Sequence, residues 1–397
     1  MNCRFGAIAG SAALAALLWA GAGAIVATEQ TAPTFEVDAS SAKPLSNDWK
    51  LGSVAAVAVD SRDHVWILQN PTGPFPQGDP TPSAVFGSSG FQEPPSLTDI
   101  LAAGKKPAPP VIEFDAEGNV VQGWGGPGNG YPWMERSTAL FPVGSPAEHG
   151  LFVDHKDNVW VTGNGHVALK FTREGKFLLQ IGELGKTGGS SDTKLLGNPT
   201  GLTVDPKTNE VYIADGYLNR RVIVFDADTG AYKRHWGAYG KPPTDGPASK
   251  RFDPNGPLPQ EFLAVHCVHI ANDGLVYVCD RQRNRIQVFK TDGTFVTEVL
   301  VAKDTLTTGP PYGSVNDVAF SRDPQQEFLF VGDGTNSKIW ILRRSTLEVL
   351  GSHASYEGNH FLAVDSRGHL YTVGSRGNRG TAPRRLASKG AVDGDRR

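Results

Sequence analysis

The chain has little net charge and little cysteine. Its 38 lysines and arginines nearly balance 41 aspartates and glutamates among 397 residues, giving a formal net charge of -3. This balance argues against a nucleic-acid partner, because such proteins carry clustered basic residues. With 39% hydrophobic residues the chain can bury a substantial core, so it is not a disordered protein.

Long apolar runs are also scarce. The only one that approaches the length of a membrane span runs from about Ala7 to Val26, after the positive charge of Arg4. This layout is typical of a secretory leader, and we expect residues 1–27 to be a signal peptide. The alternative is an uncleaved membrane anchor. The remaining chain is expected to be secreted or periplasmic, with no further membrane contact.

Only three cysteines occur, and Cys3 lies in the leader. A turn centred on Asp273 would place Cys267 and Cys279 opposite each other in a hairpin, where strand neighbours lie about 4.5–5.5 Å apart. A disulfide and a pair of buried free thiols are both compatible with this spacing.

Turn residues, in contrast, are abundant, with 47 glycines and 28 prolines among short runs of valine, isoleucine, phenylalanine and tryptophan. A unit of two strands around a polar turn recurs six times, and a third and a fourth strand follow most copies. Four antiparallel strands repeated radially form a propeller blade. The sequence therefore predicts an all-β protein, a six-bladed β-propeller around a central channel, over residues 51–375.

Three regions depart from the repeat. A proline-rich insertion, residues 69–110, is predicted to be a long loop and a candidate lid. The sixth copy has no convincing third and fourth strands, and the basic tail, residues 376–397, is a candidate for disorder. Within the N-terminal segment, residues 28–50, Thr34 to Val37 is a candidate for a strand that closes the ring.

The first residue of each copy lies at one height near the propeller axis, because it opens the innermost strand of its blade. In chain order these residues are Ala55, His149, Thr200, His266, Asn316 and His360. A single histidine is more often a core or surface residue than a ligand. Three on alternate blades would converge on the axis, and three histidines with an open fourth position are a ligand set of catalytic zinc. We therefore predict a zinc site.

Two more candidates follow second strands on the same face of the propeller. Tyr217, in Asp215-Gly216-Tyr217, suits general-base work beside a metal, and Arg281, after Asp280, suits the binding of a carboxylate. Structural roles are the alternative, since an aspartate after a strand often caps a turn and Arg281 can be a solvated surface residue.

These motifs resemble NHL-repeat propellers and, among them, the peptidyl-α-hydroxyglycine α-amidating lyases. The resemblance spans about Leu51 to Val373 and is carried by three stretches: His149-Gly150-Leu151, Asp215 to Arg221, and Asp280-Arg281 with Arg285-Ile286-Gln287. It implies a zinc held by the three histidines, Tyr217 as the catalytic base and Arg281 as a catalytic and substrate-binding residue. The implied reaction cleaves a peptide ending in α-hydroxyglycine into an amide and glyoxylate.

The sequence departs from the family pattern at three positions. Asn70, a candidate substrate-binding residue, stands where the family has a second arginine, and Gly358 stands where it has a methionine. Phe361 replaces a carboxylate that helps to hold a structural calcium, which weighs against calcium here. These changes also weigh against the lyase reaction, though not against metal binding by histidine.

A second hypothesis is therefore an exported NHL propeller that binds a peptide, protein or glycan on its loop-rich face without catalysis. On either hypothesis we expect a monomer that takes a peptide or small-molecule partner and no nucleic acid.

Overall fold

The structure is a computed structural model of the chain. It describes residues 31–38, 43, 45, 47–71, 101–134, 147–246, 253–307, 313–355, 359–374, 378–379 and 383–389. Two compact units are distinguished, Met1–Thr31 and Ala32–Arg397, and the second contains all the described strands. The expected signal peptide, most of the proline-rich insertion, Gly358 and parts of the basic tail lie outside the described residues. None of the described helices has the length and apolarity needed to cross a membrane.

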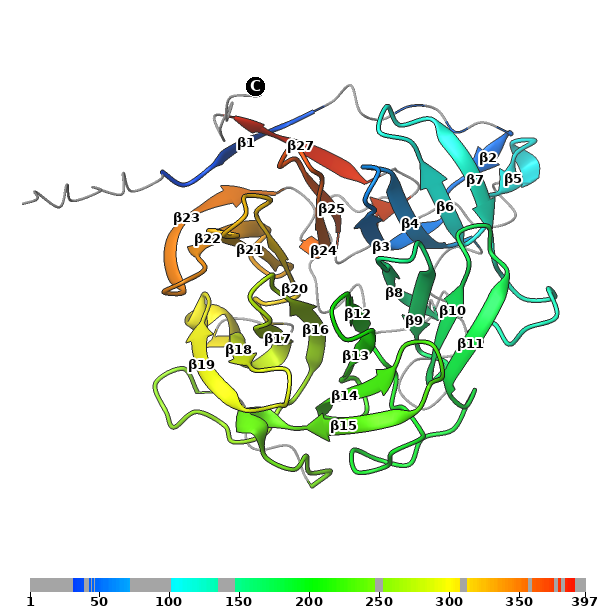
Figure 1. Ribbon diagram of the computed structural model, residues 1–397. Helices are drawn as coiled ribbons and strands as arrows, with labels where there is room; N and C mark the ends of the chain where they lie inside the picture. The colour runs from blue at the N-terminus through cyan, green and yellow to red at the C-terminus, as the bar shows by residue number, and fades with distance from the viewer. Residues whose placement is uncertain are drawn as a thin grey trace, which may run out of the picture. The chain divides into compact units, whose positions relative to one another are not determined.

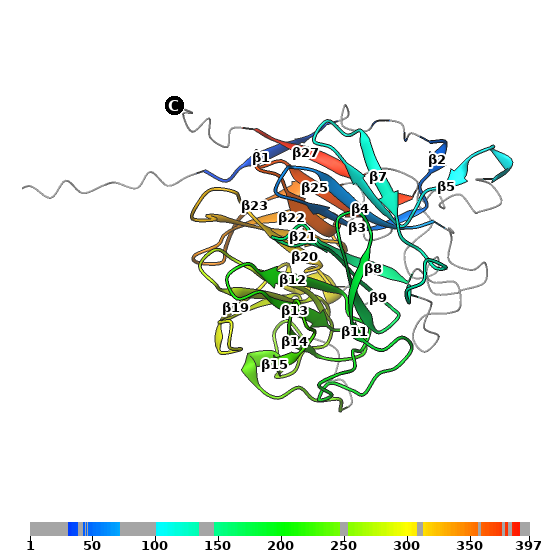
Figure 2. The same cartoon turned by 45° about the vertical axis from the view of Figure 1, so that its right-hand side comes forward.

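Six antiparallel sheets surround a central axis, as Figure 1 shows, and Figure 2 gives a second view. The predicted all-β, six-bladed propeller is confirmed. Each blade has four principal strands, and the innermost strands of neighbouring blades contact one another in a closed ring.

The strands of each blade are given from the axis outward. Blade 1 contains β3 (Ser53–Val59), β4 (Val65–Asn70), β6 (Val111–Phe114) and β7 (Val120–Trp124), and β26 (Asn378–Arg379) pairs with the inner edge of β3. Blade 2 contains β8 (Glu148–Val153), β9 (Val159–Gly163), β10 (Val167–Phe171) and β11 (Phe177–Gly182). Blade 3 contains β12 (Gly201–Asp205), β13 (Glu210–Asp215), β14 (Arg221–Asp226) and β15 (Tyr232–Trp236).

Blade 4 contains β16 (Val265–Ile270), β17 (Val276–Asp280), β18 (Arg285–Phe289) and β19 (Phe295–Leu300). Blade 5 contains β20 (Asp317–Phe320), β21 (Phe328–Asp333), β22 (Lys338–Arg343) and β23 (Glu348–Ala354). Blade 6 contains β24 (Asn359–Val364), β25 (Leu370–Gly374), β27 (Arg384–Lys389) and β1 (Thr34–Val37). Outside the blades lie the strand pair β2 (Trp49–Lys50) and β5 (Lys106–Pro107) and the 3-10 helices η2 (Ala238–Gly240), η3 (Arg281–Arg283) and η4 (Lys303–Thr307).

The blades form because their middle strands are apolar and their turns are closed by aspartate. Every residue of β17 and β18 is buried, since neighbouring blades cover both faces of these strands, whereas β19 is mostly half-exposed or exposed. In the β3–β4 turn, Asp60 accepts hydrogen bonds from the backbone amides of Arg62 and His64. Asp154 does the same in the β8–β9 turn, so one local device recurs along the chain.

Blade 6 corrects the expectation for the C-terminal tail. Residues 384–389 form β27, which pairs with β25 on one side and with the N-terminal strand β1 on the other. The register joins Thr34 to Lys389 and Val37 to Leu386. Disorder was therefore the wrong expectation for this part of the tail. The sequence predicts this strand only weakly, because Leu386 is the only apolar side chain of β27 larger than alanine.

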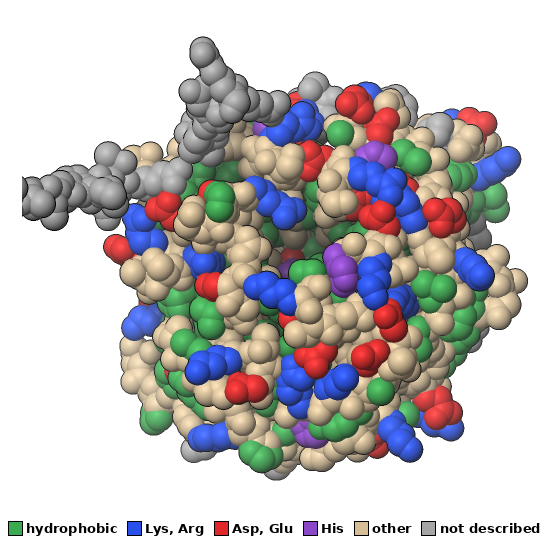
Figure 3. All heavy atoms as spheres, viewed as in Figure 1, with side chains coloured by type: hydrophobic (Ala, Val, Ile, Leu, Met, Phe, Trp, Pro, Cys, Tyr) green, Lys and Arg blue, Asp and Glu red, His purple; other side chains and the backbone are tan. Residues whose placement is uncertain are grey.

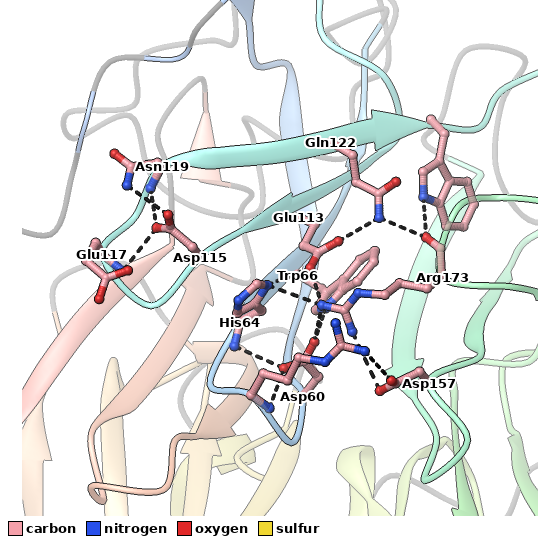
Figure 4. Close-up of polar contacts among 12 residues, drawn as sticks. Asp60, His64, Trp66, Glu113, Asp115, Glu117, Asn119, Gln122, Asp157 and Arg173 are labelled. Atoms are coloured by element: carbon pink, nitrogen blue, oxygen red, sulfur yellow. Dashed lines mark hydrogen bonds and ion pairs between the residues drawn. The ribbon is translucent and has the colours of Figure 1, made fainter.

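A buried cluster of charges joins blades 1 and 2 (Figure 4). The guanidinium of Arg173 bonds to Glu113 and lies 2.7 Å from an oxygen of Asp60, and both carboxylates are 1% exposed. His64 Nδ1 lies 2.6 Å from Glu113 Oε1. Asp60, His64 and Glu113 have the spacing of metal ligands. The guanidinium already bridges them, so we interpret the cluster as an ion pair network that holds the two blades together.

Replacing Arg173 with methionine is expected to lower the free energy of unfolding at neutral pH by about 3–5 kcal/mol, because two buried carboxylates lose their cation. Burial alone would raise the pKa of Asp60, but bonds from Trp66, two backbone amides and Arg173 hold this pKa below its ordinary value. The contribution of Asp60 is therefore complete above its unfolded pKa of about 4 and is lost as the pH falls through the lower folded value. Urea unfolding at neutral and acid pH measures both effects.

Arg62 provides the matched control, because its side chain is 52% exposed and pairs with Asp157 in the same cluster. The Arg62→Met variant should lose no more than about 1 kcal/mol. Equal losses for the two variants would show that burial of the ion pairs is not what stabilises this junction.

Candidate metal centre

A β-bulge marks each of the three histidines on the axis. The strand register shifts between Glu148 and Gly150 in β8, and equivalent shifts flank His266 in β16 and His360 in β24. A bulge places one extra residue in a strand and re-aims its side chain. The same shift occurs at Ala55 in β3, so the bulge is a feature of the repeat, and on the three histidine blades it directs the imidazoles to one point.

The three imidazoles are buried and close together. Their ring centroids lie 5.0 Å apart for His149 and His266, 4.9 Å for His266 and His360, and 4.7 Å for His149 and His360. One ring nitrogen from each lies within 4.8 Å of the others. The structure thus brings together the three residues that the repeat phase singled out.

A ring of backbone carbonyls fixes how these histidines face the axis. His149 Nδ1 lies 2.7 Å from Thr200 O, His266 Nδ1 2.6 Å from Asn316 O, and His360 Nδ1 2.9 Å from Ala55 O. These carbonyls belong to the equivalent residues of the blades that carry no histidine. Because a carbonyl only accepts, each Nδ1–H donates, which leaves the Nε2 lone pairs as ligands. The sequence could not predict this ring of carbonyls, because every residue type has a backbone carbonyl.

All three histidines are neutral near pH 7. Burial lowers the pKa of His360 to about 4, and the cation of Arg281 also lowers it. For His149 and His266, burial is again the main cause, and the neighbouring imidazoles and Arg281 add to it, so both pKa values lie well below the ordinary range. Neutral imidazole is the form that binds a metal.

The donor set fits a divalent transition metal such as zinc. His266 Nε2 is buried and has no hydrogen-bond partner among the described residues. An unsatisfied buried polar atom costs about 1–3 kcal/mol, and a metal ion at this point would satisfy it. Three imidazole nitrogens with room for a further ligand match catalytic zinc centres.

Tyr217 and Arg281 lie beside the three histidines. The Tyr217 hydroxyl is 2.7 Å from His149 Nε2, and Arg281 Nη1 donates to that hydroxyl at 3.2 Å. The guanidinium also lies over the tyrosine ring, 5.3 Å from its centroid. Gly216 allows this arrangement, since a Cβ there would lie 1.9 Å from Val265 O. His149, Tyr217 and Arg281 are thus connected through the Tyr217 hydroxyl.

Asn70 and Phe361 have different surroundings. Asn70 ends β4, is 3% exposed and pairs with Ser53, and its role in substrate binding remains a prediction. The Phe361 ring lies against all three imidazoles, with centroid distances of 5.5 Å to His149, 5.7 Å to His266 and 4.7 Å to His360. It therefore presents carbon, not a calcium ligand, to the axis. In the sequence, the only signal for Phe361 is that it replaces the carboxylate of the family pattern.

A disulfide joins Cys267 and Cys279, which lie opposite each other on β16 and β17 with a Cα–Cα distance of 4.9 Å. The bond fastens the hairpin between His266 and the segment that leads to Arg281. Of the two possibilities left open by the sequence, the structure has the disulfide.

The Cys267→Ala/Cys279→Ala double variant is expected to lower the free energy of unfolding by about 2–3 kcal/mol, as is typical of a short closed loop. Denaturant unfolding with and without a reducing agent measures the change. The reducing agent should destabilise the wild type and leave the variant unaffected. An equal response of both proteins would contradict the contribution of the disulfide.

Fold and centre together define a six-bladed β-propeller with a possible metal centre of three histidines on its axis. No family model matches the chain. Peptidyl-glycine alpha-amidating monooxygenase B of Xenopus laevis is 28% identical over 241 residues, which are 58% of this chain and 25% of that protein. A probable peptidyl-alpha-hydroxyglycine alpha-amidating lyase of Caenorhabditis elegans is 29% identical over 196 residues, 48% of this chain and 49% of the relative.

NHL repeat-containing protein 3 of Mus musculus is 27% identical over 298 residues, 72% of this chain and 71% of that protein. The chain thus spans only a quarter of the Xenopus monooxygenase and about half of the nematode lyase. The expected resemblance to NHL-repeat proteins and α-amidating lyases is confirmed.

Proposed function

We propose that this chain is a zinc-dependent lyase of the amidating type, which cleaves a peptide ending in α-hydroxyglycine into a peptide amide and glyoxylate. The observation that carries the proposal is the contact of the Tyr217 hydroxyl with His149 and Arg281 beside three neutral, converging imidazoles. The names of two relatives, an α-amidating lyase and an α-amidating monooxygenase, support the same reaction.

In this mechanism Arg281 holds the terminal carboxylate of the substrate through charge-assisted hydrogen bonds. Tyr217, as the phenolate stabilised by the Arg281 N–H, accepts the proton of the substrate hydroxyl. The C–N bond then breaks, the hydroxyl oxygen becomes the aldehyde oxygen of glyoxylate, and the nitrogen leaves as the amide after taking up the proton that Tyr217 accepted. A zinc ion held by His149, His266 and His360 would supply Lewis-acid polarisation of the substrate oxygen.

The test combines metal analysis with a product assay. Purified protein should contain about one zinc per chain and should release glyoxylate from a peptide ending in α-hydroxyglycine. The same peptide ending in glycine, which lacks the hydroxyl, is the matched control and should release none. Absence of stoichiometric transition metal would end the enzyme hypothesis, and bound zinc without glyoxylate would indicate a different substrate.

The second candidate function is binding without catalysis, with a peptide, protein or glycan on the loop-rich face. It is favoured by the match to NHL repeat-containing protein 3, which extends over 71% of that protein. The metal analysis above separates the two candidates.

We also propose that residues 1–27 are removed on export and that the mature protein is a secreted or periplasmic monomer. N-terminal sequencing of protein recovered outside the cytoplasm, together with its mass by light scattering, tests this. A retained leader would support the membrane-anchor alternative.

A further inference from the structure

Phe361 lies between the three histidines and a cavity on the central axis of the propeller, whose lining includes Phe361 but none of these histidines. It follows His360 on β24, is 6% exposed, and its ring contacts all three imidazoles. Gly201 lies on the opposite wall, where a Cβ would make an ordinary contact of 3.7 Å with Phe361 Cε1. The aromatic ring therefore separates the histidines from the channel below them.

The compartment below Phe361 is a cavity of about 310 Å³, and Figure 3 shows the molecule hollowed at the centre of its blades. Pockets that hold small ligands have volumes of about 300–1,000 Å³, so this cavity can take a small molecule. All six innermost strands contribute to its walls, which include the apolar side chains Val57, Leu151, Leu202, Val268, Val318 and Leu362.

Among the described residues that line this cavity, Asp317 has the only carboxylate, and both of its oxygens have hydrogen-bond partners. The side chain is 1% exposed, with Oδ1 2.7 Å from His269 Nε2. Its Oδ2 accepts a hydrogen bond from the Leu362 backbone amide at 2.8 Å. Both oxygens of Asp317 are therefore already hydrogen-bonded within the protein.

Arg322 gives this lining a cation, and two histidines add polar ring nitrogens. His269 is 25% exposed, and His155 and Arg322 stand at exposed positions of the same lining. Arg322 Nε donates to Val364 O at 3.0 Å, which fixes the guanidinium at the wall of blade 6. Apolar walls with these groups favour a ligand that has an apolar body and an acidic end.

We propose that this lower compartment is a second ligand site, separate from the candidate metal centre, for a small apolar carboxylate. The apolar body would fill the channel below Phe361, and the carboxylate would accept hydrogen bonds from Arg322 at the wall of blade 6. The site opens away from the three histidines, so the proposal does not depend on the lyase reaction.

Isothermal titration of the full-length protein, with the metal that it retains, tests the proposal with 1-naphthoate as the probe. The neutral 1-naphthamide has the same ring system and should bind about tenfold more weakly, because it lacks the charge-assisted hydrogen bonds. The Ala319→Trp variant fills the cavity, which Ala319 lines at 9% exposure, and should lose naphthoate binding. If that variant does not fold, Arg322→Gln should still weaken binding several-fold.

A carboxylate also binds zinc, so the variant that lacks His149, His266 and His360 is an essential control. It should bind naphthoate as tightly as the wild type, because Phe361 separates the two sites. The proposal is overturned if naphthoate does not bind at all or if the histidine variant loses it. Equal binding of naphthamide, or undiminished binding by folded Ala319→Trp, overturns it as well.

Discussion

The Tyr217→Phe variant is expected to bind zinc as the wild type does and to release glyoxylate about 10²–10⁴-fold more slowly, the range of a lost general base. The substitution removes the hydroxyl that bonds to His149 and Arg281. It keeps the ring under the Arg281 guanidinium, so the site should hold its shape. The measurement is the steady-state rate of glyoxylate release, paired with metal content.

Because the lost group acts on the substrate proton, the effect should fall on kcat more than on KM. Tyr277→Phe is the control, since Tyr277 is a buried tyrosine whose hydroxyl accepts a hydrogen bond from Arg344 at 3.3 Å, whereas Tyr217 is half-buried. That variant should keep its rate within about twofold. A Tyr217→Phe enzyme with the full rate, or one without metal, would contradict the proposed role.

Simultaneous replacement of His149, His266 and His360 by alanine is expected to abolish stoichiometric zinc binding. Any single replacement leaves two imidazoles and should weaken zinc binding by more than about 100-fold. Loss of a residue that only orients a metal ligand weakens binding by about 10–100-fold, and loss of a ligand itself should cost more. Elemental analysis of the triple variant and chelator competition with the single variants measure these changes.

His155→Ala is the control for the histidine variants, because this exposed histidine lines the lower compartment and lies outside the centre. It should retain about one zinc per chain. Retention of zinc by the triple variant would place the metal elsewhere in the chain and would remove the basis of the proposed reaction.

Most of the fold could be predicted from the sequence because each blade repeats one local pattern. Buried second strands such as β17 read as continuous apolar runs, and aspartates such as Asp60 mark the turns that precede them. The third strand of blade 6 escaped this pattern, since β27 is mostly polar and buries mainly Leu386. Its pairing with β1 depends on a contact between the two ends of the chain, which no local periodicity records.

The candidate site was partly predictable for a similar reason. Repeat phase was enough to bring the three histidines to one height, and Tyr217 and Arg281 were indicated by their places after second strands and by the resemblance. The bulges and the carbonyls of Ala55, Thr200 and Asn316 were not predictable, because backbone geometry leaves no residue signature. Nor does an alternating pattern reveal that the Phe361 ring lies across the axis.

Closure of blade 6 by both ends of the chain has a consequence for biosynthesis. Thr34 and Lys389, which pair in β1 and β27, are 355 residues apart, so this blade forms only after Lys389 has been synthesised. His360 lies on the same blade, in β24. The nascent protein therefore holds at most two of the three histidines in place, and the third arrives when the ring closes. Capture of a metal ion at full affinity would then coincide with the final step of folding.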